Sequence, residues 1–122
     1  MDKAQAINSF WNSFGLPAYD ENTVPKDAPM PRITYSVATD QLGSVIALSA
    51  SIWYRSSSWK DITLKTKEIE KHLGEHGGDV IKLDDGYVYL CKGTPFAQRM
   101  SDPDDSIRRV YINIQAEFLT PY

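Results

Sequence analysis

The stretch Val80–Lys92, VIKLDDGYVYLCK, decides how the rest of the sequence is interpreted. Its two halves, Val80–Leu83 and Tyr87–Lys92, are rich in β-branched and aromatic residues, and Asp85-Gly86 stands between them. Asp-Gly between two such runs favours the tight turn of a β-hairpin, because glycine adopts positive φ without steric cost. The stretch therefore predicts two antiparallel strands.

Three further segments alternate between apolar and polar residues, which is typical of half-buried strands: Arg32–Thr39, Val45–Tyr54 and Ile107–Phe118. The first two are separated only by a short turn-forming break, so we expect them to form an antiparallel hairpin. In Val45–Tyr54 the larger apolar residues share one face of the strand, and Trp53 lies on the other.

Two segments have helical periodicity. In residues 3–14 the large apolar residues lie at i, i+3, i+4 and i+7, namely Ile7, Phe10, Trp11 and Phe14. The second helix begins near Ser58, which fits the N-cap, with Asp61 as the partner of a capping box. It ends at Gly74 or at Gly77-Gly78, and its apolar stripe consists of Trp59, Ile62, Ile69 and Leu73.

The 122 residues form one domain by the usual size range of domains. Residues 16–31 contain Pro17, Pro25, Pro29 and Pro31 and are expected to be an extended connector without a helix or a central strand. Residues 32–119 are the body. The expected order is α-β-β-α-β-β-β, an α+β fold with a mainly antiparallel sheet and helices packed on one face.

The composition is that of a globular chain, with 42% hydrophobic and 24% charged residues. Lysine and arginine number 13 against 16 acids, so nucleic acid is not the expected partner. One cysteine suits a reducing compartment, and the sequence has neither a membrane-spanning run nor a signal peptide. We expect a cytoplasmic place of synthesis and no membrane partner.

The sequence predicts no set of residues arranged for catalysis. His72–His76 matches the zinc-peptidase pattern H-x-x-E-H, but Gly74 lies inside it, the helix is ending there, and no third ligand is at hand. Cys91 lies in a predicted strand with no activating base beside it. Glycine-rich phosphate loops are absent. The expectation is therefore no enzyme, no cofactor and no metal.

Gly93 to Ser106 is expected to be a polar connection between two strands. The segment from Arg99 to Arg109 brings cations and anions close together in the sequence, as salt-bridged partner contacts often do, although an ordinary polar loop fits equally well. Trp53, on the face away from the core, is the other candidate for a contact; it is either exposed for a neighbouring subunit or covered by the N-terminal helix. The candidate interface residues are Trp53, Arg99, Asp102, Asp104, Asp105, Arg108 and Arg109.

Three blocks of the sequence resemble one family. They are SASIWYRSSSWKDI (residues 49–62), KGTPFAQRMSDPDDSIRRVYINIQAEFL (92–119), and NSFWNSFGLPAY (8–19) with PRITYS (31–36). Together they are similar to tail terminator, or tail-completion, proteins of long-tailed phages and prophages of Gram-positive bacteria.

The resemblance implies a structural virion protein that closes into a ring, usually of six copies. Such a ring ends polymerisation of the tail tube and joins the tail to the head. The implied partners are further copies of the chain, the tail-tube protein and a head-completion protein, and DNA passes through the lumen without sequence-specific binding. The protein would reside in the virion tail, and in the host cytoplasm during assembly.

Two alternatives stay open. One is a head-closure or head-tail joining protein of the same machine. The other is a small ligand-binding or enzymatic domain that uses the sheet face lined by Trp53, Tyr87, Tyr89 and Tyr111.

Overall fold

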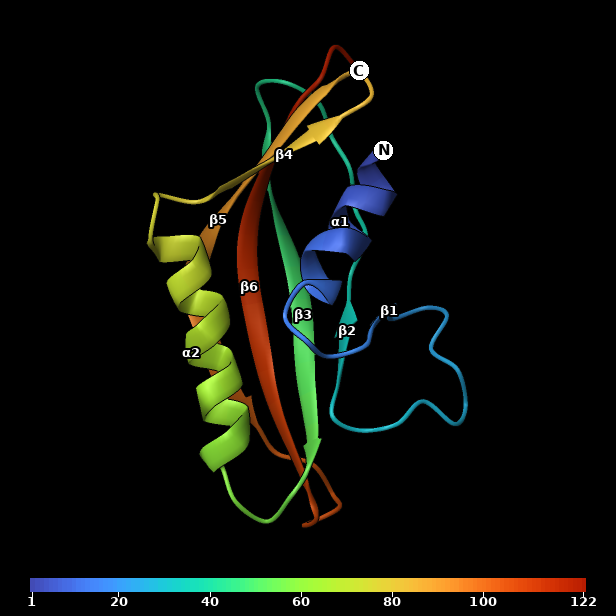
Figure 1. Ribbon diagram of the computed structural model, residues 1–122, viewed down its shortest axis with the longest axis vertical. Coiled ribbons are helices and arrows are strands. Elements are labelled where there is room, and N and C mark those ends of the chain that lie inside the picture. The colour runs from blue at the N-terminus through green and yellow to red at the C-terminus, as the bar shows by residue number, and fades with distance from the viewer.

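A computed structural model describes all 122 residues and shows one six-stranded sheet with two helices (Figure 1). The elements in chain order are α1 (Lys3–Asn12), β1 (Ala18–Asp20), β2 (Arg32–Tyr35), β3 (Val45–Arg55), α2 (Lys60–Gly74), β4 (Asp79–Leu83), β5 (Gly86–Met100) and β6 (Ile107–Leu119). The order across the sheet is β1-β2-β3-β6-β5-β4. The predicted α+β class is confirmed, and neither helix is long and apolar enough to cross a membrane.

All neighbouring strands are antiparallel except β1 and β2. Both predicted antiparallel pairs are present, with Ile33 of β2 opposite Ile52 of β3 and Val88 of β5 opposite Ile81 of β4. The strand predicted to reach Thr39 ends at Tyr35, so residues 36–44 form a longer connection to β3 than expected. The centre of the sheet is the long pair β3 and β6, whose register runs from Val45 opposite Glu117 to Arg55 opposite Ile107.

Both helices lie on the same face of the sheet, in front of it in Figure 1. Alternate strand residues point toward them and form one continuous core with the helical stripes. Its fully buried side chains come from every part of the chain and include Trp11, Ile33, Leu48, Ile52, Ile62, Ile69, Leu73, Leu90, Ile112 and Phe118.

The opposite face of the sheet carries no helix, and we call it the uncovered face. Residues that pair directly across neighbouring strands lie on the same face, so the register defines its members. They include Thr34, Val45, Ser49, Ser51, Trp53, Tyr89, Cys91, Arg109, Tyr111, Asn113, Gln115 and Glu117.

The predicted element order lacked one strand, which lies at the edge of the sheet within the connector. Ala18–Asp20 form the edge strand β1, which pairs in parallel with β2. A segment this short next to Pro17 has no strand pattern of its own, and it is ordered by its partner strand and by α1. The Asn12 side chain binds both backbone groups of Ala18, accepting from its N–H at 3.0 Å and donating to its C=O at 3.3 Å.

The predicted loop over residues 93–106 was also too long. After an irregularity between Lys92 and Ala97, β5 continues to Met100, and Ala97 resumes pairing opposite Ile112 of β6. Pro95 and the irregular register conceal this half of the strand in the sequence. Phe96 and Ala97 nevertheless pack against the core and hold it in place.

The helix starts differ from the expectation as well. The capping box predicted for α2 is wrong: Trp59 occupies the N-cap and no side chain caps that end, although the Ser58 hydroxyl accepts from the Lys60 N–H at 3.1 Å. A capping box is present instead at α1, between Asp2 and Gln5.

Candidate functional site

The candidate interface residues lie at one end of the sheet, where β3 ends and β5 turns into β6. The strand register divides them between three places. Trp53 and Arg109 are on the uncovered face, Arg99 and Arg108 are on the helix face, and Asp102, Asp104 and Asp105 are in the β5–β6 turn. The structure therefore brings the seven residues to one end of the sheet and divides them between its two faces and the turn.

On the uncovered face, Trp53 is half-buried and lies among arginines. The guanidinium of Arg109 is 4.7 Å from the centroid of the Trp53 ring, and that of Arg32 is 5.8 Å away. The indole N–H donates to the Thr34 hydroxyl at 3.0 Å. No helix covers the ring, so Trp53 stays on the list of contact residues.

On the helix face, Trp59 has the same kind of surroundings. The guanidiniums of Arg99 and Arg108 lie 4.5 and 5.3 Å from its centroid. Arg108 also donates to the backbone C=O of Ser57 at 2.8 Å and to that of Asp105 at 2.9 Å. Its role is therefore structural, because it ties the start of α2 to the β5–β6 turn.

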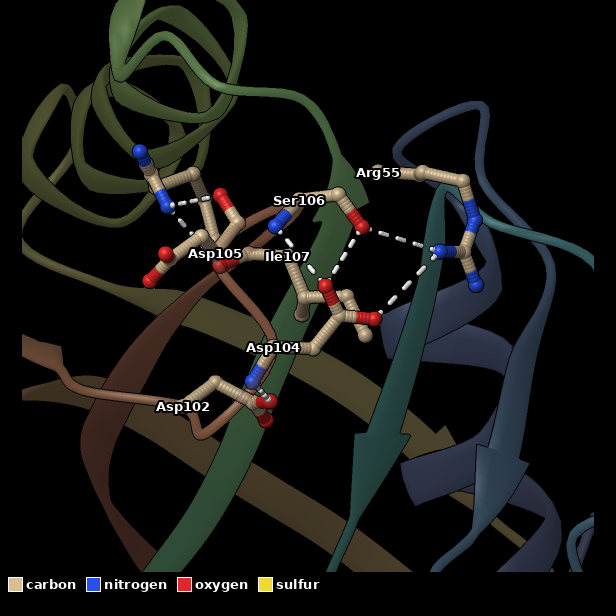
Figure 2. Close-up of polar contacts among 7 residues, drawn as sticks. Arg55, Asp102, Asp104, Asp105, Ser106 and Ile107 are labelled. Carbon is tan, nitrogen blue, oxygen red and sulfur yellow. Dashed lines mark hydrogen bonds and ion pairs between the residues drawn. The ribbon is translucent and has the colours of Figure 1, made fainter.

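Figure 2 shows that the acidic turn is organised by its own hydrogen bonds. Asp102 accepts from the N–H of Asp104 at 2.9 Å, and Asp104 accepts from the N–H and hydroxyl of Ser106 at 2.9 and 2.7 Å. The bond from the Ser106 hydroxyl is the main cause that holds the pKa of Asp104 below its usual range, followed by the bond from the backbone of Ser106; Arg55, 3.8 Å away, lowers it further.

The other end of the uncovered face is apolar. Tyr87 lies opposite Leu119, and in the adjacent row Val45 and Val80 flank Glu117 and Tyr89. We call Val45, Val80, Tyr87 and Leu119 the apolar patch; their exposed fractions are 61%, 59%, 47% and 37%. These four are close to half of the nine exposed large hydrophobic residues of the chain. Exposed apolar side chains are therefore concentrated in this patch rather than scattered over the surface.

Sequence reasoning named Tyr87 but missed the other three residues of the apolar patch. Each lies on the outward-facing side of its own strand, which alternation alone can indicate. What brings them together is the β3-β6-β5-β4 order, and that order is not legible in the sequence.

The four aromatic residues of the ligand-binding alternative do share the uncovered face, as that interpretation required. The hollow on this face is about 140 Å³ and is lined by Val45, Tyr89, Cys91, Gln115, Ala116 and Glu117. Pockets for drug-sized ligands usually enclose roughly 300–1,000 Å³, so this hollow is small for such a role.

The largest hollow, about 500 Å³, lies elsewhere, between the two chain termini and the β4–β5 turn. It is lined mainly by polar residues, among them Asp2, Lys3 and Asp84. The terminal ammonium of Met1 is 2.6 Å from Asp84, and Lys3 donates to the backbone C=O of Tyr122 at 2.7 Å and to that of Asp40 at 2.8 Å. These contacts hold the two ends of the chain together and bring no nucleophile near a base.

The histidines of the H-x-x-E-H pattern do not converge. His72 lies 2.9 Å from Asp79 and packs edge-on against Phe14, with ring centroids 5.4 Å apart. His76 is exposed in the turn after α2. No group of three potential metal ligands occurs in the structure. Cys91 is half-buried on the uncovered face, with its Sγ 3.9 Å from Oε1 of Gln115.

Comparison of the chain with protein-family models, with curated proteins and with solved structures gives no significant match. The likeness to phage tail terminators therefore depends on the sequence blocks alone.

Proposed function

We propose that this protein is a tail terminator, or tail-completion, protein that forms a ring on the end of a phage tail tube. In this role it stops tube polymerisation and offers a surface for joining the head. The ring consists of six copies if it follows the proteins that the sequence resembles. The observation that carries the proposal is the uncovered face, an extended sheet surface with the apolar patch at one end and the Trp53 cluster at the other.

The chemistry of this face favours protein contact. Flat surfaces that combine exposed apolar side chains with tryptophan, tyrosine and arginine are typical of the energetically dominant parts of protein interfaces. Trp53 and Arg109 are held in place by neighbours, which lowers the entropy lost when a partner binds. The half-buried polar residues between the two ends, such as Ser49 and Asn113, supply hydrogen-bonding groups.

The charge of the uncovered face indicates how it is oriented in such a ring. Arg32, Arg55, Lys82 and Arg109 belong to this face, against the single carboxylate Glu117. A lumen lined by this many cations would hold the phosphates of the passing DNA. We therefore orient the uncovered face toward the tube protein or a neighbouring copy and away from the lumen.

Capping of tail tubes tests the proposal. Tubes that have polymerised without a terminator are incubated with the purified protein, and bound rings are counted at the tube ends by negative-stain electron microscopy. We expect rings at one end of the tube and no further growth there. Leu119→Asp should abolish capping, because it places a charge in the apolar patch.

The matched control is Leu64→Asp, which changes a leucine on α2, outside the uncovered face, that is more exposed than Leu119, at 57% against 37%. It should cap as the unchanged protein does. Binding to isolated portal or head-completion proteins without tube capping would move the assignment to head closure. A persistent monomer that binds neither would support the ligand-binding alternative.

A further inference from the structure

The loop between β1 and β2 projects from one edge of the sheet (Figure 1). We call residues 21–31 the arm. Two turns shape it, through hydrogen bonds from the Thr23 N–H to the Asp20 C=O at 2.9 Å and from the Ala28 N–H to the Pro25 C=O at 3.1 Å. Most of its residues are exposed, and Arg32 fixes its base by donating to the Ala28 C=O at 2.7 Å. The arm is thus a shaped, largely exposed projection that is hydrogen-bonded to the rest of the chain near its two ends.

The opposite edge of the sheet carries an open groove. β4 pairs only with Gly86–Leu90, so the outer edge of β5 from Cys91 to Met100 has no neighbouring strand. Helix α2 runs beside this part of β5 and leaves a hollow of about 260 Å³ between them. We call it the α2–β5 groove; its lining is Thr63, Thr66, Lys67, Glu70, Ala97, Gln98, Arg99 and Val110.

The arm and the groove carry opposite unpaired charges. Asp20, Glu21 and Asp27, in and beside the arm, form no ion pair, and they outnumber Lys26. In the groove, Glu70 is already paired with Lys92 at 3.5 Å.

The two groove cations have no carboxylate partner. Lys67 makes no ion pair, and Arg99 lies over the ring of Trp59. Because these charged groups have no ion-pair partner within one copy, they can pair with opposite charges on another copy without breaking an existing ion pair.

We infer that the arm of one copy lies in the α2–β5 groove of the next copy around the ring. Because the two surfaces are on opposite edges of one sheet, the contact is heterologous, and each copy both gives an arm and receives one. Such a contact generates a closed ring when the rotation that relates successive copies brings the last copy into contact with the first. The inference rests on the proposed ring and assigns it a specific contact.

The reach of the arm is sufficient. A loop of this length that leaves and returns to one edge extends at most about 16–20 Å from it, since an extended chain spans ~3.3–3.6 Å per residue. This exceeds the ~10–12 Å diameter of a helix, so the arm can pass beside α2 of its neighbour and enter the groove.

Disulfide trapping on the full chain tests the contact. In a Cys91→Ser background, Lys26→Cys in the arm is combined with Thr63→Cys in the groove, and the protein is oxidised alone and on tail tubes. We expect a ladder of covalent oligomers that ends at the ring. Lys26→Cys combined with Ser49→Cys, on the uncovered face, is the matched control and should give no ladder. Chains that carry only one of the two new cysteines should give covalent dimers when mixed, and nothing larger.

Charge reversal gives an independent measurement. Lys67→Glu should lower the yield of cross-linked oligomers about tenfold by replacing attraction with repulsion. The double variant Asp27→Lys/Lys67→Glu should restore most of it. Failure of the double variant to restore the yield would count against the pairing.

The outcomes separate this inference from the proposed function. No ladder from a protein that still caps tubes overturns the arm contact and leaves the terminator role. A ladder without capping supports the arm contact and overturns the terminator role. If the protein gives no ladder and does not cap tubes, both the arm contact and the terminator role are overturned.

Discussion

Arg109 covers Trp53 on the uncovered face of the sheet, with its guanidinium 4.7 Å from the ring centroid. The same arginine donates from Nε to the Ser51 hydroxyl at 3.0 Å. Ser51 is only 4% exposed, although no helix lies over this face. Trp53 and Arg109 thus lie beside the buried Ser51 hydroxyl on an otherwise uncovered face. Their mutual contact holds both side chains in place, so a partner protein can bind to them.

Arg109→Ala should lower the free energy of unfolding by about 0.5–1 kcal/mol, the usual contribution of a cation–π contact at a partly exposed site. Urea denaturation measures this. The matched control is Arg55→Ala: Arg55 lies on the same face but is exposed, and its pairing with Asp104 at 3.8 Å is of the kind that contributes little. An equal effect of the two substitutions would show that the contacts of Arg109 with Trp53 and Ser51 add no stability.

The two faces of β3 should respond very differently to truncation. Ile52→Ala removes a side chain that is fully buried against the helices and should cost about 2–5 kcal/mol of unfolding free energy. Val45→Ala, in the same strand but in the apolar patch, should change it by less than about 0.5 kcal/mol. Val45→Ala should instead weaken tube capping, so the two variants separate stability from association.

The sequence was sufficient for elements whose own residues carry the pattern. The stripe Ile7, Phe10, Trp11 and Phe14 predicted α1, and alternation predicted β3 and β6, because burial of one face enforces those periods. The sequence was insufficient for strands that form only because they pair with a strand elsewhere in the chain. β1 exists because β2 pairs with it, and the second half of β5 exists because β6 pairs again after Lys92.

The site was predictable to the same degree. Arg99, Arg108 and Arg109 were recognised together because they are close in sequence. Their faces could not be assigned, because residues 93–106 were interpreted as a loop and a loop has no alternation to count. The apolar patch draws on four strands, so only the strand order reveals it.

Gly86, in the turn of the β4–β5 hairpin, should tolerate replacement poorly. A Cβ at this position would lie 2.1 Å from the backbone C=O oxygen of Leu119, in the neighbouring strand. Gly86→Ala must therefore push β5 and β6 apart and should cost at least about 2 kcal/mol of unfolding free energy. Gly43→Ala, at a φ of +95° with nothing within 4 Å, should cost only the conformational strain, about 1 kcal/mol. Thermal or urea unfolding of the two variants makes the comparison.

The last prediction concerns the pH dependence of the β5–β6 turn. Hydrogen bonds from Ser106, together with the nearby Arg55, hold the pKa of Asp104 below its usual range in the folded protein. A carboxyl whose pKa is lower in the folded state stabilises that state above its unfolded pKa, and this contribution is lost as the pH falls through its folded pKa. Carbon-13 NMR titration of the Asp104 carboxyl should therefore give a midpoint below that of an ordinary aspartate.

Two substitutions separate the causes of that low midpoint. Ser106→Ala should raise the Asp104 midpoint more than Arg55→Ala does, because the Ser106 hydroxyl is the largest cause and the arginine a smaller one. A larger effect of Arg55→Ala would mean that the ion pair, rather than the hydrogen bonds of the turn, controls the charge of Asp104. The end of the sheet would then be organised by long-range attraction, and added salt would raise the midpoint toward the ordinary value.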